Sequence, residues 1–151
     1  FIAALREDLP AEGSIVVYNR RFESGILVSL GRRFPEFASW TEETSARMAD
    51  LLAPFAEFRF YHPDQAGRVS MKKVLPALTD LDYDGFAVGN GEAANAAFAG
   101  MVYRSLRGDP PGGERETLRA ALEEYCRRDT EGMIHILKKL RETVRGTGEV
   151  T

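Results

Sequence analysis

An acidic side chain interrupts the apolar face of the last predicted helix. Apolar and aromatic residues recur at steps of three and four along this helix, which is the spacing of a single helical face. They are Leu118, Leu122, Tyr125, Met133, Ile136, Leu137, Leu140 and Val144. Asp129 falls on this face, four residues after Tyr125 and four before Met133. Because a lone buried carboxylate is costly without a cation or hydrogen bonds, we interpret Asp129 as a site carboxylate. The alternative is an Asp that caps a helix restart or pairs with a buried arginine.

A second acid, Glu23, raises the same question near the start of the chain. It lies in the first turn of a helix predicted over residues 20–33, on the side that carries Leu27 and Leu30. This helix follows Ser14–Tyr18, an uncharged β-branched segment that we predict to be a strand buried on both faces. We interpret Glu23 as a second candidate site carboxylate. The alternative is that it only stabilises the positive end of the helix dipole, as first-turn acids commonly do.

Helices predominate among the elements that must position these two acids. The predicted helices cover residues 1–9, 20–33, 41–52, a short segment after Ser70, 92–106 and 114–145, and the predicted strands cover 14–18 and 58–61. Asn19 ends the first strand and is placed to cap the helix that follows, and Thr41 is placed to cap the third helix. One or two strands do not complete an open sheet. The pattern therefore predicts a helix-rich α/β fold with an incomplete set of strands.

Bulk composition is that of one ordinary globular domain. The chain has 151 residues, of which 44% are hydrophobic and 28% charged, with a net charge of −3 and one cysteine. No apolar run approaches the roughly 18 residues of a membrane span, so we expect a cytoplasmic protein without membrane contact. The two histidines lie far apart, which disfavours a histidine-rich zinc site. The N-terminus lacks a methionine and a basic start, and we expect the chain to be a fragment of a longer protein.

Two short motifs resemble those of a known nuclease family. In residues 14–23 a strand that ends in Asn19 is followed by two residues, an aromatic residue and Glu23, which resembles the second motif of the DnaQ-like (DEDD) 3′–5′ exonucleases. Tyr125 and Asp129, as Tyr-x-x-x-Asp on a late helix, resemble the third motif of the tyrosine subtype. The order of the motifs and their strand-then-helix context also match. The resemblance implies an RNase H-like fold and attack on a DNA or RNA 3′ end.

A longer stretch is similar to an uncharacterised bacterial domain family that often follows a Cas4-like nuclease domain. This likeness to a domain of unknown function spans roughly residues 14–140 and is carried by residues 69–76 and 125–130. Taken with the motifs, it implies that residues 1–151 are a single domain fragment. The fragment would be the C-terminal part of an RNase H-like exonuclease domain that lacks its opening strands.

The resemblance also implies roles for individual residues. Two Mg²⁺ or Mn²⁺ ions would be bound in part by Glu23 and Asp129, since hard cations take carboxylate oxygens as ligands. Tyr125 would be the catalytic residue that orients the attacking water, because a free tyrosine is a poor base at neutral pH. The expected nucleic-acid contacts are Asn19, Arg20, Arg21, Lys72 and Lys73. For the basic residues the alternative is ordinary solvated surface charge. Trp40, Phe60 and Tyr61 are of a type that stacks on bases, but we expect them to pack in the core.

Two departures from the family pattern leave a second interpretation open. No Asp-x-Glu motif stands ahead of Ser14, and Glu23 occupies a position where the family has Asp. We therefore expect these residues to be inactive alone, within a parent that is a metal-dependent 3′–5′ exonuclease. The alternative is a degenerate, non-catalytic module that binds nucleic acid or another protein. We also expect the edge of the 14–18 strand to drive homodimerisation, since exposed edges associate.

An acidic loop resembles the start of a calcium-binding EF-hand. Asp80, Asp82, Asp84 and Gly85 are spaced as in such a loop, between two predicted helices. The acid required at the twelfth position is replaced by Gly91, however. We interpret the segment as an acidic turn.

Overall fold

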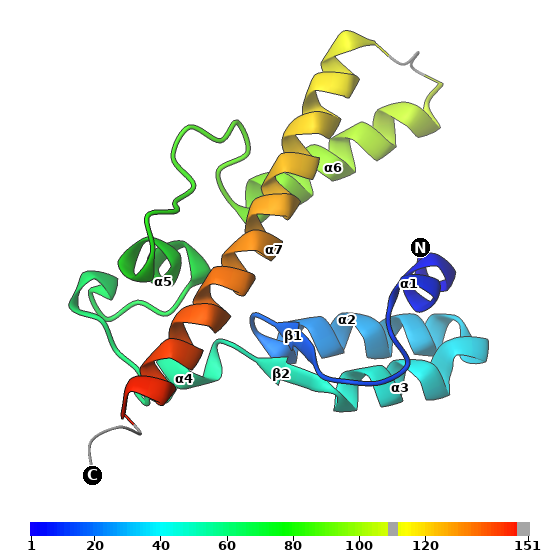
Figure 1. Cartoon of the computed structure of the whole chain (residues 1–151). Coiled ribbons are helices and arrows are strands. Elements are labelled where there is room, and N and C mark those ends of the chain that lie inside the picture. Colours follow the sequence, from blue (N-terminus) through cyan, green and yellow to red (C-terminus); the bar gives the residue numbers. More distant parts are fainter. Residues whose placement is uncertain (109–111, 148–151) are drawn as a thin grey trace. The chain divides into compact units, whose positions relative to one another are not determined.

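The computed structural model describes residues 1–108 and 112–147 and divides into two compact units. Unit 1 comprises Phe1–Lys73 and unit 2 begins at Val74. In the described residues there are seven α-helices, two short 3₁₀ helices and one sheet of two parallel strands (Figure 1). The predicted helix-rich α/β class is thereby confirmed. None of the helices in 1–108 and 112–147 combines the length and the apolar composition that crossing a bilayer requires.

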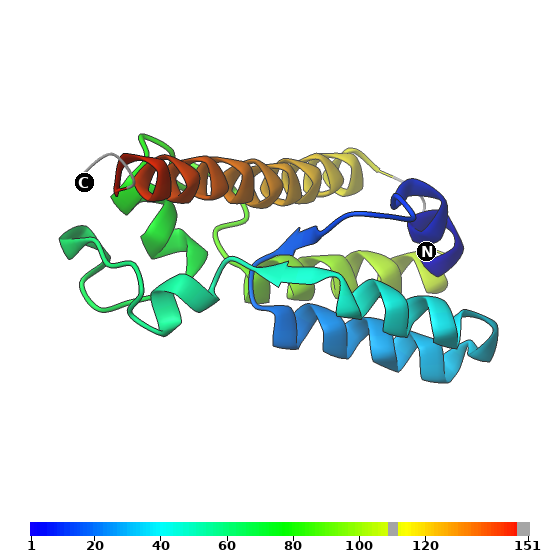
Figure 2. The same ribbon diagram turned by 60° about the horizontal axis from the view of Figure 1, so that its bottom comes forward.

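Unit 1 is built around a parallel strand pair joined by two helices. Its elements are α1 (Ile2–Asp8), β1 (Ile15–Val17), α2 (Arg20–Arg33), a 3₁₀ turn (Pro35–Phe37), α3 (Ala38–Ala46), β2 (Met48–Asp50), α4 (Ala53–Ala56) and a second 3₁₀ turn (Pro63–Gln65). β1 and β2 pair in register, with Ile15 opposite Met48 and Val17 opposite Asp50. Helices α2 and α3 run side by side in Figure 2, where α2 passes below the strands and α3 leads into β2. Val17, Leu27 and Met48 form the buried centre, onto which Trp40 packs.

The close packing of α2 on α3 depends on one glycine. Gly31 is buried, and a Cβ atom built on it would lie 2.3 Å from the Thr41 hydroxyl and 3.3 Å from the Ala38 Cα. A Cβ at 2.3 Å would overlap the Thr41 hydroxyl oxygen, so an alanine at this position would force Thr41 or the two helices to shift. The hydroxyl of Thr41 donates to the Ala38 carbonyl within α3, at 2.8 Å.

The helix predicted over 41–52 is confirmed only in part. The helix predicted over 41–52 begins earlier, at Ala38, and ends at Ala46, so Thr41 is a buried interior residue rather than an N-cap. Residues Met48–Asp50 form β2 instead. Their composition is not strand-like, but the ladder with β1 continues through Ile15 N–H to the Arg47 carbonyl and Leu51 N–H to the Val17 carbonyl, at 3.0 and 2.9 Å. Pairing with β1 therefore overrides local propensity.

The strand predicted over 58–61 is also absent. Phe58 has a left-handed backbone (φ 53°), and the segment forms turns and bends after α4. Phe60 turns inward and packs edge-to-face on Phe55, with ring centroids 5.7 Å apart. Phe58 and Tyr61 are exposed. The alternating aromatic residues therefore belong to a turn in which only the Phe60 ring points inward, and they do not form a strand.

Unit 2 is dominated by one long helix. α5 (Met71–Leu78) starts at the end of unit 1 and continues into unit 2, where α6 (Gly91–Leu106) and α7 (Gly113–Thr147) follow. Helices α6 and α7 pack against each other. The predicted helices over 92–106 and 114–145 are confirmed to within two residues. Tyr125 and Ile136 on the predicted stripe of α7 are buried, whereas Val144 near its end is exposed.

Candidate functional site

Asp129 lies on the inner face of α7, within hydrogen-bonding distance of a residue that the sequence patterns did not indicate. The Tyr83 hydroxyl donates to Asp129 Oδ1 at 2.7 Å. Tyr125, one helical turn before Asp129, also hydrogen-bonds with this carboxylate. The rings of Tyr83 and Tyr125 lie 6.1 Å apart between centroids. The half-buried carboxylate is therefore compensated by two tyrosine hydroxyls, which accounts for its place in an apolar stripe.

Both tyrosines are held in their protonated form. Burial raises the pKa of Tyr125 to about 12, with further contributions from the Asp129 carboxylate and the hydrogen bond to it. Burial and the same carboxylate raise the pKa of Tyr83 well above its ordinary value. Near neutral pH each hydroxyl thus keeps its proton and acts as a donor. This favours an orienting role for Tyr125 over that of a base.

The segment that carries Tyr83 is the acidic loop between α5 and α6. The Asp82 side chain accepts the Asp84 N–H at 2.9 Å, so it closes its own turn. Phe86 lies beneath the Arg128 guanidinium, 5.2 Å from the ring centroid, and Val88 is buried. These contacts are those of a packed turn. They support the interpretation of residues 80–85 as an acidic turn.

Glu23 lies in unit 1, in the first turn of α2 as predicted. Asn19 has a left-handed backbone (φ 75°), and its side chain caps α2 by accepting the Phe22 N–H at 3.4 Å. Glu23 N–H bonds to the Asn19 carbonyl at 3.3 Å. The Glu23 side chain is half-buried, and burial raises its pKa above the ordinary value. Burial therefore disfavours the ionised form of Glu23.

A further acid, Asp50, lies at the same end of the sheet. It is the last residue of β2, and its two carboxylate oxygens accept the N–H groups of Asn19 and Arg20, each at 2.9 Å. It also accepts the Leu52 N–H at 2.9 Å. Ligands of parallel sheets bind at the carboxyl ends of strands, which is where Asp50 and Asn19 lie. The sequence pattern does not indicate Asp50, because it predicts a helix over residues 41–52, whereas the structure has β2 ending at Asp50.

The predicted nucleic-acid residues fall into different surroundings. Arg20 Nη2 donates to the Ser45 carbonyl at 3.3 Å, so its side chain contributes to packing α2 on α3. Arg21 is exposed and lines a shallow depression of about 440 Å³ on α2, together with Asn19 and the exposed Phe22. At the start of α5, Lys72 is half-buried and Lys73 exposed.

The aromatic residues considered for base stacking separate into two groups. Trp40 packs edge-to-face with Phe37, at 6.5 Å between centroids, and joins the core. Phe60 packs on Phe55. For these two residues the expectation of core packing is confirmed, whereas Tyr61 is exposed.

The donor chemistry fits a hard cation, but the number of donors falls short. Glu23 and Asp129 offer carboxylate oxygens, which Mg²⁺ and Mn²⁺ prefer. They belong to different units. Within residues 1–108 and 112–147, no group of three or more histidine, cysteine, aspartate or glutamate side chains is placed to hold a metal ion. Glu23 and Asp129 are therefore two separate carboxylates in the described residues, each with the oxygen donors that a hard cation takes.

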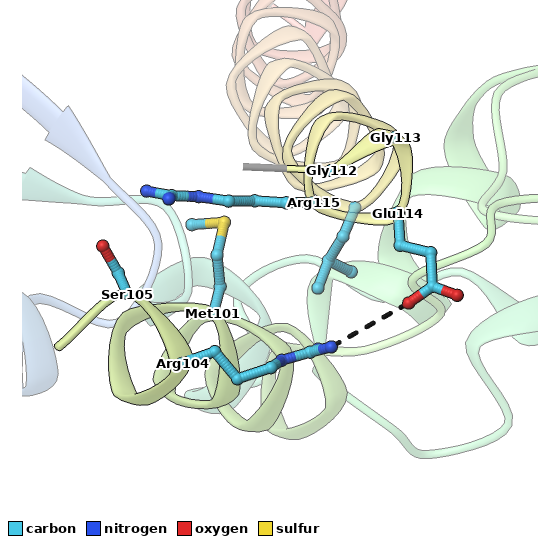
Figure 3. A pocket seen from close by; sticks show the side chains of 8 residues that line it. Met101, Arg104, Ser105, Gly112, Gly113, Glu114 and Arg115 are labelled. Carbon is cyan, nitrogen blue, oxygen red and sulfur yellow. Dashed lines mark ion pairs between the residues drawn. The ribbon is translucent and has the colours of Figure 1, made fainter. Parts of the chain in front are cut away.

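A separate pocket lies between α6 and the start of α7 (Figure 3). It has a volume of about 220 Å³ and is lined by Met101, Arg104, Ser105, Gly112, Gly113, Glu114, Arg115 and Leu118. Arg104 and Glu114 point toward one another, at 4.0 Å, while Arg115 extends past Met101 to the other side. None of the predicted site residues lines this pocket.

Comparison with known proteins gives one match. No curated protein and no solved structure matches the chain. Residues 1–70, which contain β1, Glu23 and β2 but not Tyr125 or Asp129, match the family described as Domain of unknown function (DUF2779).

Proposed function

We propose that this chain is part of a metal-dependent 3′–5′ exonuclease acting on DNA or RNA, with a partial RNase H-like fold. One observation carries the proposal: Asp129 is a half-buried carboxylate on the inner face of α7, one turn from Tyr125 and held by the Tyr83 hydroxyl. A carboxylate in a fixed orientation beside a protonated tyrosine suits the third motif of the tyrosine-type exonucleases. The parallel pair β1–β2, with Glu23 just beyond its carboxyl end, supports the second motif.

Each residue has a defined task in this proposal. Divalent cations, when bound, would hold the scissile phosphate and acidify the attacking water. Glu23 and Asp129 contribute oxygen ligands for them. Tyr125 keeps its proton near neutrality, because burial and Asp129 raise its pKa to about 12. It therefore orients the water or a phosphate oxygen by hydrogen bonding and does not remove a proton.

The proposal requires carboxylates that these residues do not supply. No Asp-x-Glu precedes Ser14 in the sequence. We therefore expect the 151 residues alone to lack nuclease activity. Glu23 has one methylene more than the Asp of the family motif, so Glu23→Asp is the conservative variant that should retain activity.

The test uses the full-length polypeptide that carries this sequence, with Mn²⁺ and 3′-labelled single strands of DNA and RNA. Asp129→Asn should lower cleavage by roughly 10³-fold, since several kcal/mol of charge stabilisation are removed. Glu116→Gln is the matched control, because Glu116 is an exposed acid on the same helix. No cleavage by wild type, or equal cleavage by Asp129→Asn, would contradict the proposal.

A second candidate is a non-catalytic module that binds nucleic acid or protein. The specific observation in its favour is that Asp129 already accepts tyrosine hydroxyls, so burial of its charge is compensated without a cation. This module would bind a labelled strand or a partner with unchanged affinity after addition of EDTA. Strand binding that is abolished by EDTA and restored by Mn²⁺ would exclude this alternative.

A further inference from the structure

We infer that Tyr83 is a positioning residue for Asp129, an inference that rests on the proposed function. Neither the second nor the third exonuclease motif includes Tyr83, which is 46 positions from Asp129 in the sequence. Its hydroxyl nevertheless donates to Asp129 Oδ1 at 2.7 Å, an ordinary length for a hydroxyl donor and a carboxylate. Tyr83 therefore acts on the site through Asp129.

The Tyr83 ring is fixed by aromatic neighbours on both the loop and the helix. Its centroid lies 6.2 Å from that of Phe86, three residues later, and 6.1 Å from that of Tyr125 on α7. Aromatic pairs at these distances attract each other and restrict ring motion. The direction of the Tyr83 hydroxyl is thus set by packing and not by the hydrogen bond alone.

Other residues of the loop between α5 and α6 also pack on α7, close to Asp129. Arg128, adjacent to Asp129, covers the Phe86 ring at 5.2 Å and pairs with Glu131 at 3.3 Å. Val88 is only 5% exposed. The start of α6 is close as well, since a Cβ added to Gly91 would lie 3.8 Å from the Tyr125 hydroxyl. These contacts restrict the movement of the loop that carries Tyr83, so its hydroxyl keeps a fixed direction toward Asp129.

The chemical consequence concerns the direction of the Asp129 oxygens. A carboxylate offers about four acceptor sites, and the Tyr83 hydroxyl takes one of them. The hydrogen bond restricts rotation of the carboxylate about the side-chain bonds. Hydrogen-bond partners of ligating carboxylates typically change metal affinity or activity by roughly 10- to 100-fold when removed.

The decisive comparison is Tyr83→Phe against Tyr103→Phe in the full-length polypeptide. Tyr83→Phe keeps the ring packing and removes only the hydroxyl. Tyr103→Phe makes the same change at an exposed tyrosine of unit 2, whose hydroxyl accepts from Arg107. Mn²⁺ binding is measured by calorimetry, and kcat and KM are measured on a 3′-labelled single strand. Circular dichroism and amide hydrogen exchange report folding.

We expect Tyr83→Phe to weaken Mn²⁺ binding by roughly 10- to 100-fold and to lower kcat with little change in KM. Hydrogen exchange in residues 82–88 should accelerate, with the rest of unit 2 unchanged. Tyr103→Phe should match wild type in every measurement.

Wild-type Mn²⁺ binding and kcat in Tyr83→Phe would overturn the positioning role while the proposed function stands. A fall in thermal stability with unchanged Mn²⁺ affinity would also overturn it, because a merely structural hydroxyl behaves in this way. Absence of Mn²⁺ binding and cleavage in wild type would instead refute the proposed function, and the inference with it.

Discussion

Tyr18, the residue after β1, connects the end of the sheet to a distant part of unit 1. Its hydroxyl donates to the Val69 carbonyl at 2.5 Å. Burial raises the pKa of Tyr18 well above its ordinary value of 10.0, and the Asp50 carboxylate adds to the rise. Because the folded-state pKa exceeds the unfolded one, this contribution to stability is complete below pH 10 and declines as pH rises further.

For Tyr18 we predict that the stability advantage of wild type over Tyr18→Phe shrinks at high pH. Tyr18→Phe should lower the free energy of unfolding by about 1 kcal/mol at pH 7, because a hydrogen bond is lost. Above pH 10 wild type should lose stability faster than the variant, so that the two curves converge. Urea denaturation between pH 7 and 11 measures this, with Tyr61→Phe as a control at an exposed tyrosine. Parallel curves for wild type and Tyr18→Phe would contradict the assignment.

Asp50, at the carboxyl end of β2, holds the backbone around the start of α2 and after β2 by hydrogen bonds. Its carboxylate accepts the backbone N–H groups of Asn19, Arg20 and Leu52. Asp50→Ala leaves these donors without their acceptor and removes a negative charge near the start of α2, so we expect a loss of about 1–3 kcal/mol. Urea unfolding of Asp50→Ala, compared with Asp64→Ala at an exposed acid, is the measurement. Equal stabilities of the two variants would show that Asp50 is dispensable for the fold.

Helices α2, α6 and α7 could be predicted from the sequence because their signals are local. Asn19 and Pro35 bracket α2, and the periodic apolar residues of α7 define its length and its inner face. β2 could not be predicted in this way, because Met48–Asp50 becomes a strand only through pairing with β1. Two hydrogen bonds of the candidate site could not be predicted for the same reason, because their partners are far apart in the sequence. The Asn19 N–H donates to Asp50 on the neighbouring strand, and the Tyr83 hydroxyl donates to Asp129, which is 46 positions later in the sequence.

The contact between α2 and α3 gives a prediction at the scale of elements. Gly31→Ala would place a methyl group 2.3 Å from the Thr41 hydroxyl, so we expect a loss of about 1–3 kcal/mol from overpacking. Gly25→Ala is the matched control on the same helix, because nothing lies within 4 Å of an added Cβ there. That control should be neutral or stabilising by up to about 1 kcal/mol. Unfolding in guanidinium chloride distinguishes the two.

A second substitution tests the cause of this loss. Thr41→Ala removes the hydroxyl that the new methyl would meet, so the double variant Gly31→Ala/Thr41→Ala should recover part of the stability that Gly31→Ala loses. Strictly additive losses in the double variant would show that the contact with Thr41 is not responsible.

At the scale of the whole molecule, the two candidate motifs lie in separate units. Glu23 and Asp50 are in unit 1, whereas Tyr83, Tyr125 and Asp129 are in unit 2. The match to the domain of unknown function covers residues 1–70 and thus the part with Glu23. The proposed function expects each acid to contribute to Mn²⁺ binding, and Mn²⁺ calorimetry on Glu23→Gln and on Asp129→Asn tests the two acids separately. Loss of Mn²⁺ binding in both variants is the expected result.

The sheet itself provides the last prediction, which concerns self-association. The N–H of Ile15 and the carbonyl of Val17 face β2, since they bond to the Arg47 carbonyl and the Leu51 N–H. Strand geometry therefore directs the N–H and carbonyl of Val16 to the opposite edge of β1. In residues 1–108 and 112–147 the sheet has no strand beyond β1 on that side. An edge with free donors pairs with other strands.

We therefore expect these 151 residues to self-associate through the edge of β1 as their concentration rises. Val16→Pro removes the outward N–H and, because proline is tolerated at sheet edges, should leave the β1–β2 bonds intact. Sedimentation velocity over a range of concentrations should show association for wild type and a monomer for Val16→Pro. Ser14→Pro, one residue before β1, is the control for introducing proline nearby without removing this donor. A clean wild-type monomer at high concentration, or equal association of Val16→Pro and wild type, would rule out pairing through this edge.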